Sequence, residues 1–181
     1  MKKITIALLC GCAFALFAGD VELKNVINKS KIGDKTIRGW TVNKSRKDLG
    51  SAEVIQGSEK DEKAFKIIAN TQDVCYYYLS GLKAKAGDKL EISAEIKGKS
   101  AGKFYLGYYT YTAKGVYFEA VQAVKSFAVT ENKTEVKAEF VIQNGAKGQE
   151  TACIRPFIRI DRQSEVIVED IEVEVDYADK K

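Results

Sequence analysis

The sequence is constrained most by an alternation of apolar and polar residues that recurs along the chain. Residues 90–97 show it most clearly, because Leu, Ile and Ala alternate there with Glu, Ser and Lys. Successive side chains of a strand point to opposite faces, so a period of two is typical of a strand buried on one side. Helical spacing is nearly absent from residue 21 onward. We therefore expect strands, among them 90–97, 104–111, 136–142, 153–161 and 171–175.

Turn-forming residues separate these runs. Gly87-Asp88, Ala113-Lys114-Gly115 and Asn144-Gly145 are typical turn sequences. Strands about ten residues apart with such turns predict an antiparallel sandwich or barrel. Hydrophobic residues make up 45% of the chain, enough for a packed core. No linker or internal repeat interrupts the pattern, which predicts one domain over residues 20–181.

Two irregularities refine this expectation. Pro156 lies inside the run Cys153–Ile160, and proline cannot donate to a strand ladder, which predicts an edge strand or a bulge. In the last run, Val166 and Val168 are out of phase with Ile171 and the valines after it. A β-bulge near Glu169 and Asp170, re-aiming Asp170, would bring both sets inside. The alternative is a strand end followed by a new strand.

The first residues have the pattern of a secretory signal. Lys2 and Lys3 precede an uncharged run, residues 4–18, which is too short to span a bilayer comfortably. We therefore expect residues 1–19 to be a signal peptide and the protein to be exported, to the periplasm, the cell surface or the medium. A lipoprotein signal is the alternative, because Leu9-Cys10-Gly11-Cys12 loosely resembles a lipobox.

Composition excludes several kinds of chemistry. The chain has no histidine, so a histidine base or metal ligand is excluded. The net charge of +4 is small and of mixed sign, which does not indicate nucleic-acid binding. Beyond the signal, two cysteines remain, Cys75 and Cys153. In an exported protein such a pair predicts a disulfide; the alternative is two buried thiols.

Two strands carry side chains suited to a ligand. In 104–111, Phe104, Leu106 and Tyr108 form the more apolar face, which puts Tyr105, Tyr109 and Tyr111 on the other face. In 153–161, isoleucines form one face, and the other carries Arg155, Phe157, Arg159 and Asp161. Tyrosine offers a flat ring for stacking on a sugar and a hydroxyl for hydrogen bonding. The alternatives are a covered second layer for the tyrosines and cross-strand carboxylate pairing for the arginines.

Acidic pairs invite comparison with glycosidases. Glu172 and Glu174 share one face of the last strand, and glycoside hydrolysis uses two carboxylates. The strand simply alternates acids with Ile and Val, as a solvated face does, so we expect no catalysis. No glycine-rich phosphate loop is present either.

The order of several short motifs resembles a known family. These are Glu22-Leu23-Lys24-Asn25, Gly39-Trp40-Thr41, a Gly81-Leu82 turn leading into the strand that ends at Lys97-Gly98, and a closing strand containing Glu169-Asp170-Ile171. This order is similar to that of the exported jelly-roll carbohydrate-binding modules of families four, nine and twenty-two. The resemblance covers nearly all of the chain beyond the signal.

The resemblance implies a jelly-roll β-sandwich that binds a polysaccharide through aromatic side chains. It also implies a structural Ca²⁺, for which Asp170 matches the closing-strand aspartate and Glu22 an acidic position near the start. We therefore expect a secreted, non-catalytic glycan-binding protein, with Tyr105, Tyr109, Tyr111, Arg155, Phe157 and Arg159 as binding residues. The alternative is an envelope protein that uses the same sandwich for protein contacts.

Overall fold

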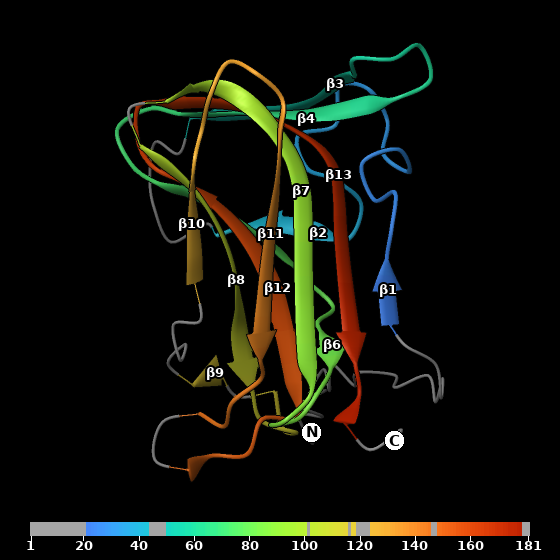
Figure 1. Cartoon of the computed structure of the whole chain (residues 1–181), viewed down its shortest axis with the longest axis vertical. Coiled ribbons are helices and arrows are strands. Elements are labelled where there is room, and N and C mark those ends of the chain that lie inside the picture. The colour runs from blue at the N-terminus through green and yellow to red at the C-terminus, as the bar shows by residue number, and fades with distance from the viewer. Residues whose placement is uncertain are drawn as a thin grey trace, which may run out of the picture.

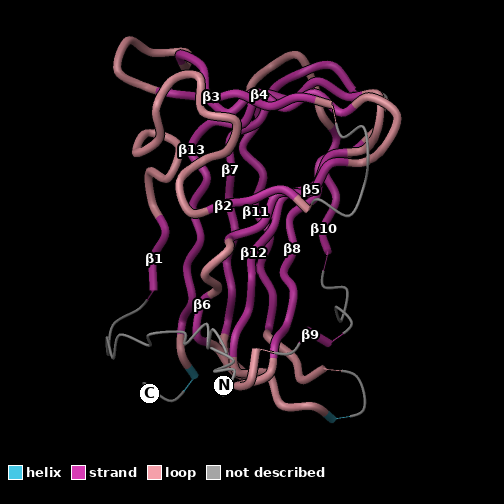
Figure 2. The backbone as a smooth tube through the Cα atoms, turned by 180° about the vertical axis from the view of Figure 1, so that it is seen from behind, coloured by secondary structure: helices cyan, strands magenta, loops and turns pink. Residues whose placement is uncertain are grey.

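The computed structural model describes residues 21–43, 50–100, 102–115, 117–118, 124–145 and 148–178. The predicted signal, residues 1–19, lies outside them. The described chain is built from strands in two antiparallel sheets (Figures 1 and 2), which confirms the predicted β-sandwich. The first sheet has the order β11-β7-β13-β4-β3, with β1 also pairing β13; the second has the order β10-β8-β12-β5-β2, with β6 on β12 and β9 on β8.

The strands have the following bounds. In the first sheet they are β1 (Val21–Leu23), β3 (Ser51–Gln56), β4 (Lys63–Ala69), β7 (Lys89–Ser100), β11 (Thr134–Val141) and β13 (Ser164–Asp176). In the second they are β2 (Trp40–Val42), β5 (Val74–Tyr78), β6 (Leu82–Lys83), β8 (Lys103–Tyr111), β9 (Tyr117–Phe118), β10 (Val124–Ala128) and β12 (Cys153–Ile160).

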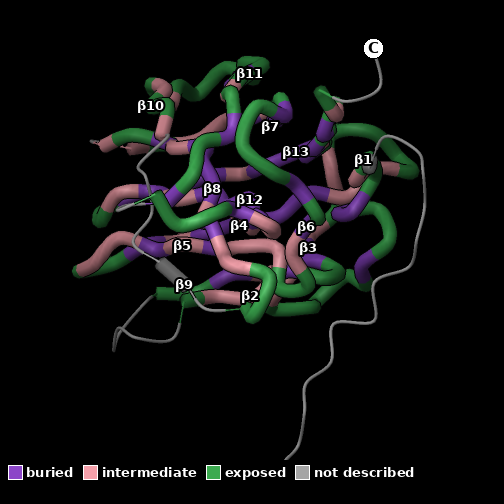
Figure 3. The backbone as a smooth tube through the Cα atoms, turned by 90° about the horizontal axis from the view of Figure 1, so that it is seen from below, coloured by how far each residue is buried: buried purple, intermediate pink, exposed green. Residues whose placement is uncertain are grey.

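The core lies between the two sheets and is made by alternate residues of the long strands. On β7 the buried residues are Leu90, Ile92, Ala94 and Ile96, as the alternation predicts. The second sheet contributes Phe104, Leu106 and Tyr108 from β8 and the isoleucines of β12. Figure 3 shows buried segments toward the centre and exposed segments around the outside. Burial of this apolar surface supplies most of the free energy that favours folding.

The predicted bulge is present in β13. The pairing of β13 with β7 shifts between Glu169 and Glu172, and Asp170 has a positive φ of +47°, outside the range of a regular strand. The shift lets Val166 and Val168 share the core with Ile171, Val173 and Val175.

Within the bulge, Asp170 is exposed and Glu169 is buried on the outer face of the sheet. Glu169 accepts hydrogen bonds from Ser58 at 2.8 Å and Lys97 at 3.0 Å, and Lys133 lies 3.5 Å away. Burial raises its pKa, but the hydrogen bonds and the two lysine charges outweigh this and hold the pKa of Glu169 below its usual value. The bulge therefore directs Glu169, beside Asp170, into a polar cluster.

The prediction that Pro156 marks an edge strand is wrong, because β12 lies inside its sheet. One side of β12 pairs with β8 along its whole length. The other side pairs with β6 at Cys153 and Ile154 and with β5 from Phe157 onward. Pro156 falls between these two partners, so a residue without an N–H is accommodated where the neighbouring strand changes.

The predicted disulfide between Cys75 and Cys153 is also wrong. Cys75 lies opposite Arg159, six residues along β12 from Cys153. At about 3.3 Å per residue the two cysteines are roughly 20 Å apart along the strand, whereas bridged Cα atoms lie within about 7 Å. Both residues are half-buried thiols that no disulfide joins.

Candidate functional site

The outer face of the second sheet collects aromatic and arginine side chains from three adjacent strands. Residues opposite each other in antiparallel strands point to the same face, and Tyr105, Tyr109 and Tyr111 lie opposite Arg159, Arg155 and Cys153. Tyr77 of β5 lies opposite Phe157. We call this set the tyrosine–arginine face: Tyr77, Tyr105, Tyr109, Tyr111, Arg155, Phe157 and Arg159.

The centre of this face is aromatic. The ring of Tyr109 lies over Phe157 with centroids 4.7 Å apart, and meets Tyr77 edge to face at 6.1 Å. Phe157 is therefore only 3% exposed although it points away from the core, while both tyrosines are half-buried. The hydroxyl of Tyr109 also lies 3.3 Å from Sγ of Cys75. Such contacts hold the rings in fixed orientations.

An arginine stacks on a tyrosine at each end of the face. The guanidinium carbon of Arg155 lies 4.3 Å from the ring centroid of Tyr111, and its Nη1 donates to the Tyr111 hydroxyl at 3.3 Å. The guanidinium of Arg159 lies 4.1 Å from the ring of Tyr105. These are cation–π distances. Both arginines are half-buried, so stacking fixes the planes of their donor groups.

Asp161 continues the face beyond Tyr105. Its Oδ2 accepts hydrogen bonds from the Tyr105 hydroxyl at 3.1 Å and from the Lys103 backbone N–H at 2.8 Å. Burial and the hydrogen bond to Asp161 raise the pKa of Tyr105, and Arg159 opposes part of this shift. The Tyr105 hydroxyl is therefore protonated at neutral pH and donates a hydrogen bond to the Asp161 carboxylate.

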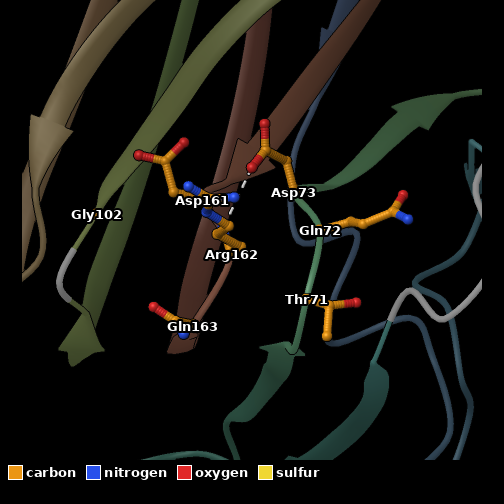
Figure 4. Close-up of a pocket in the computed structure, with 7 residues that line it drawn as sticks. All are labelled: Thr71, Gln72, Asp73, Gly102, Asp161, Arg162 and Gln163. Atoms are coloured by element: carbon orange, nitrogen blue, oxygen red, sulfur yellow. Dashed lines mark hydrogen bonds between the residues drawn. The ribbon is translucent and has the colours of Figure 1, made fainter.

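A polar pocket of about 640 Å³ adjoins this end (Figure 4). Three chain connections line it: Thr71, Gln72 and Asp73 before β5, Gly102 before β8, and Asp161, Arg162 and Gln163 after β12. The Arg162 N–H donates to Asp73 at 3.2 Å. A Cβ on Gly102 would lie 2.4 Å from the Asp161 side chain, so glycine is needed for this close approach. Hydroxyl, amide and carboxylate groups of this kind suit a polar ligand.

All six predicted binding residues lie on this one face, with the tyrosines turned away from the core as expected. The face also includes Tyr77, which the local pattern does not predict, and it extends to Asp161, which alternation puts on this side of the run 153–161. Alternation within β5 separates buried Tyr76 from Tyr77, but the register that puts Tyr77 beside Phe157 joins segments eighty residues apart along the chain. Local pattern carries no information on that register.

The acidic residues lie elsewhere. Glu172 and Glu174 belong to the first sheet, where they pair with Ser93 and Glu91. Glu22 pairs across β1 with Glu174 and forms an ion pair with Lys24. Among the residues that the structure describes, no three carboxylates or thiols are grouped so as to hold a metal ion. The Ca²⁺ that Glu22 and Asp170 were expected to bind therefore stays a prediction.

Comparisons with known proteins give only structural matches. No family model matches the sequence, and no curated protein matches it. Within the described ranges, no helix has the length and apolar character needed to cross a membrane.

Several solved structures share the fold. The CBM22-1 xylan-binding domain of Paenibacillus barcinonensis Xyn10C matches with a TM-score of 0.53 and 14% identity, over 82% of this chain and 99% of that domain. The CBM22-1-GH10 modules of Clostridium thermocellum Xyn10B match at 0.55 and 17% identity, over 79% of this chain and 26% of that one. A cyclase from Fischerella sp. TAU matches at 0.60 and 11% identity, over 88% and 99%.

These matches are consistent with the resemblance that the motif order gives. Identities this low establish the fold alone, and a fold hosts different functions. The chain has the jelly-roll β-sandwich fold found in CBM22 xylan-binding domains.

Proposed function

We propose that this protein binds a glycan, without catalysis, through the tyrosine–arginine face. The observation that carries the proposal is the convergence of four tyrosines, a phenylalanine and two arginines on the outer face of one sheet. Sugar rings have apolar faces and polar edges, and tyrosine side chains match both. The arginine N–H groups add donors for sugar oxygens.

Two further observations support a binding role. The rings are held by stacking at 4.7 Å and by cation–π contacts near 4 Å, so little side-chain entropy remains to be lost on binding. The two glutamates considered for hydrolysis, Glu172 and Glu174, lie on the other sheet. The Paenibacillus domain with this fold binds xylan, which makes plant polysaccharides the first ligands to test.

Binding is tested by affinity electrophoresis and calorimetry against a panel of soluble polysaccharides. Tyr111→Ala removes one ring and one hydrogen-bond acceptor at the edge of the face. We expect a loss of about 1–2 kcal/mol, roughly five- to thirtyfold in affinity. Ile167→Ala is the control, because Ile167 is a half-buried apolar residue of the first sheet. Its affinity should equal that of the unmodified protein.

The outcomes separate the alternatives. Equal binding by Tyr111→Ala would place the ligand elsewhere. Failure of the whole panel to bind would favour protein contacts as the role of this face. Release of reducing sugar by the purified protein would contradict a purely binding role.

We propose that residues 1–19 direct export, which mass measurement of the mature protein tests directly.

A further inference from the structure

We infer that the glycan is an acidic one and that Arg155 and Arg159 bind its carboxylates. This inference rests on the proposed function, because it assigns a ligand class to the same face. Lysines and arginines differ in how their charges are paired in this molecule. In the part of the chain that the structure describes, the cation of every ion pair is a lysine, as in Lys137–Glu91 at 2.7 Å and Lys133–Glu95 at 2.7 Å. Neither Arg155 nor Arg159 has a carboxylate partner there.

Charges are paired differently on the two outer faces. The outer face of the first sheet pairs its charges, with Lys66 bonded to Glu165 and Lys97 to Glu169. Across the strands of the second sheet, Arg155 lies opposite Tyr109, and Arg159 lies opposite Tyr105 and Cys75. The nearest acid on β12's outer side, Asp161, is already engaged by Tyr105 and Lys103. The positive charges at the two ends of the face are therefore not neutralised by any ion pair among the described residues.

The arginines also have unused donors. Nε of Arg155 and Nε of Arg159 are buried without a hydrogen-bond partner among the described residues. A buried donor without an acceptor is costly, and among the described residues the protein leaves these two guanidiniums incompletely hydrogen-bonded. A guanidinium presents paired N–H groups that match the two oxygens of a carboxylate. Stacking on Tyr111 and Tyr105 holds these groups in place.

The distance between Arg155 and Arg159 suits a polymeric ligand. Arg155 and Arg159 are four residues apart on β12, about 13 Å along the strand, with the aromatic centre of Phe157, Tyr109 and Tyr77 between them. A chain could stack a sugar on the centre while acidic groups on either side meet the two arginines. Uronic-acid polysaccharides have this combination of sugar rings and carboxylates. Sulfated polysaccharides offer the same charge on a different group.

The test compares polygalacturonate with its carboxyl-reduced form, and dextran sulfate with dextran. We expect polygalacturonate to bind roughly ten- to a hundredfold more tightly than the reduced polymer, and less tightly as salt increases. Arg155→Gln and Arg159→Gln should each remove about tenfold or more of this preference, and Arg155→Lys should restore only part of it. Lys137→Gln, on the first sheet, is the matched control and should change nothing. Melting curves confirm that each variant folds.

The outcomes distinguish this inference from the proposed function. Equal binding of polygalacturonate and its reduced form would overturn the inference and leave glycan binding intact. Failure of every polysaccharide to bind would overturn both. Dextran sulfate binding as tightly as polygalacturonate would overturn the assignment to carboxylates. Loss of the preference in Lys137→Gln would show that general charge, and not these two arginines, is responsible.

Discussion

At the scale of single residues, Glu172 shows how neighbouring charges set a titration. Burial raises its pKa, and the charges of Asp170, Glu22 and Glu174 add to this effect, while Lys24 opposes it. A raised pKa means that the folded state binds the proton more tightly than the unfolded state. Ionisation of Glu172 at neutral pH therefore costs stability, and the cost disappears as the pH falls through this pKa.

The Glu172→Gln variant should consequently melt at a higher temperature than the unmodified protein at pH 7.5, by roughly 1–3 °C. The difference should shrink toward pH 4, where the unmodified side chain becomes protonated. Thermal melts at both pH values check this, and a variant less stable at pH 7.5 would contradict it.

The predicted calcium site is tested by thermal melts of the unmodified protein with Ca²⁺ and with a chelator. A bound Ca²⁺ stabilises the folded state by mass action, so the chelator should lower the melting temperature.

At the scale of elements, the bulge determines which residues of β13 reach the core. Its geometry requires a left-handed conformation at Asp170, with φ at +47°. Asp tolerates this region better than most residues, and β-branched residues tolerate it least. A valine at this position should therefore strain the bulge.

We expect Asp170→Val to lower the free energy of unfolding by about 1–2 kcal/mol, or the melting temperature by roughly 2–8 °C. Asp170→Gly should leave it nearly unchanged. Asp176→Val is the control, because Asp176 is exposed on the same strand and has no positive φ. Equal losses in the two valine variants, measured by thermal unfolding, would show that backbone strain at the bulge is not the cause.

The strands also show which structural features local sequence predicts and which it does not. Alternation predicts the faces of β7, β8 and β12, and the change of phase in β13 predicts the bulge, because these are properties of neighbouring residues. Pairing joins distant segments, so local pattern could not place β12 inside its sheet or Tyr77 beside Phe157. For the same reason Cys75 and Cys153 suggested a disulfide that the register forbids.

At the scale of the whole molecule, the absence of that disulfide leaves two thiols on the second sheet. A thiol reagent should therefore label two cysteines in the chain from residue 20 onward, once it is unfolded without reductant. The melting temperature should be the same with and without reductant, since no cross-link restricts the unfolded state. Finding no reactive thiol before reduction would contradict the strand register described here.

The position of β13 has a consequence for how the molecule assembles. It is the last strand described, yet it lies between β7 and β4 and also holds β1. Without β13, the β7–β11 pair and the β3–β4 hairpin are not joined in the sheet order, and each has an open edge where β13 lies. The first sheet can therefore close only after translation has reached residue 176, and its folding depends on distant pairings that form slowly.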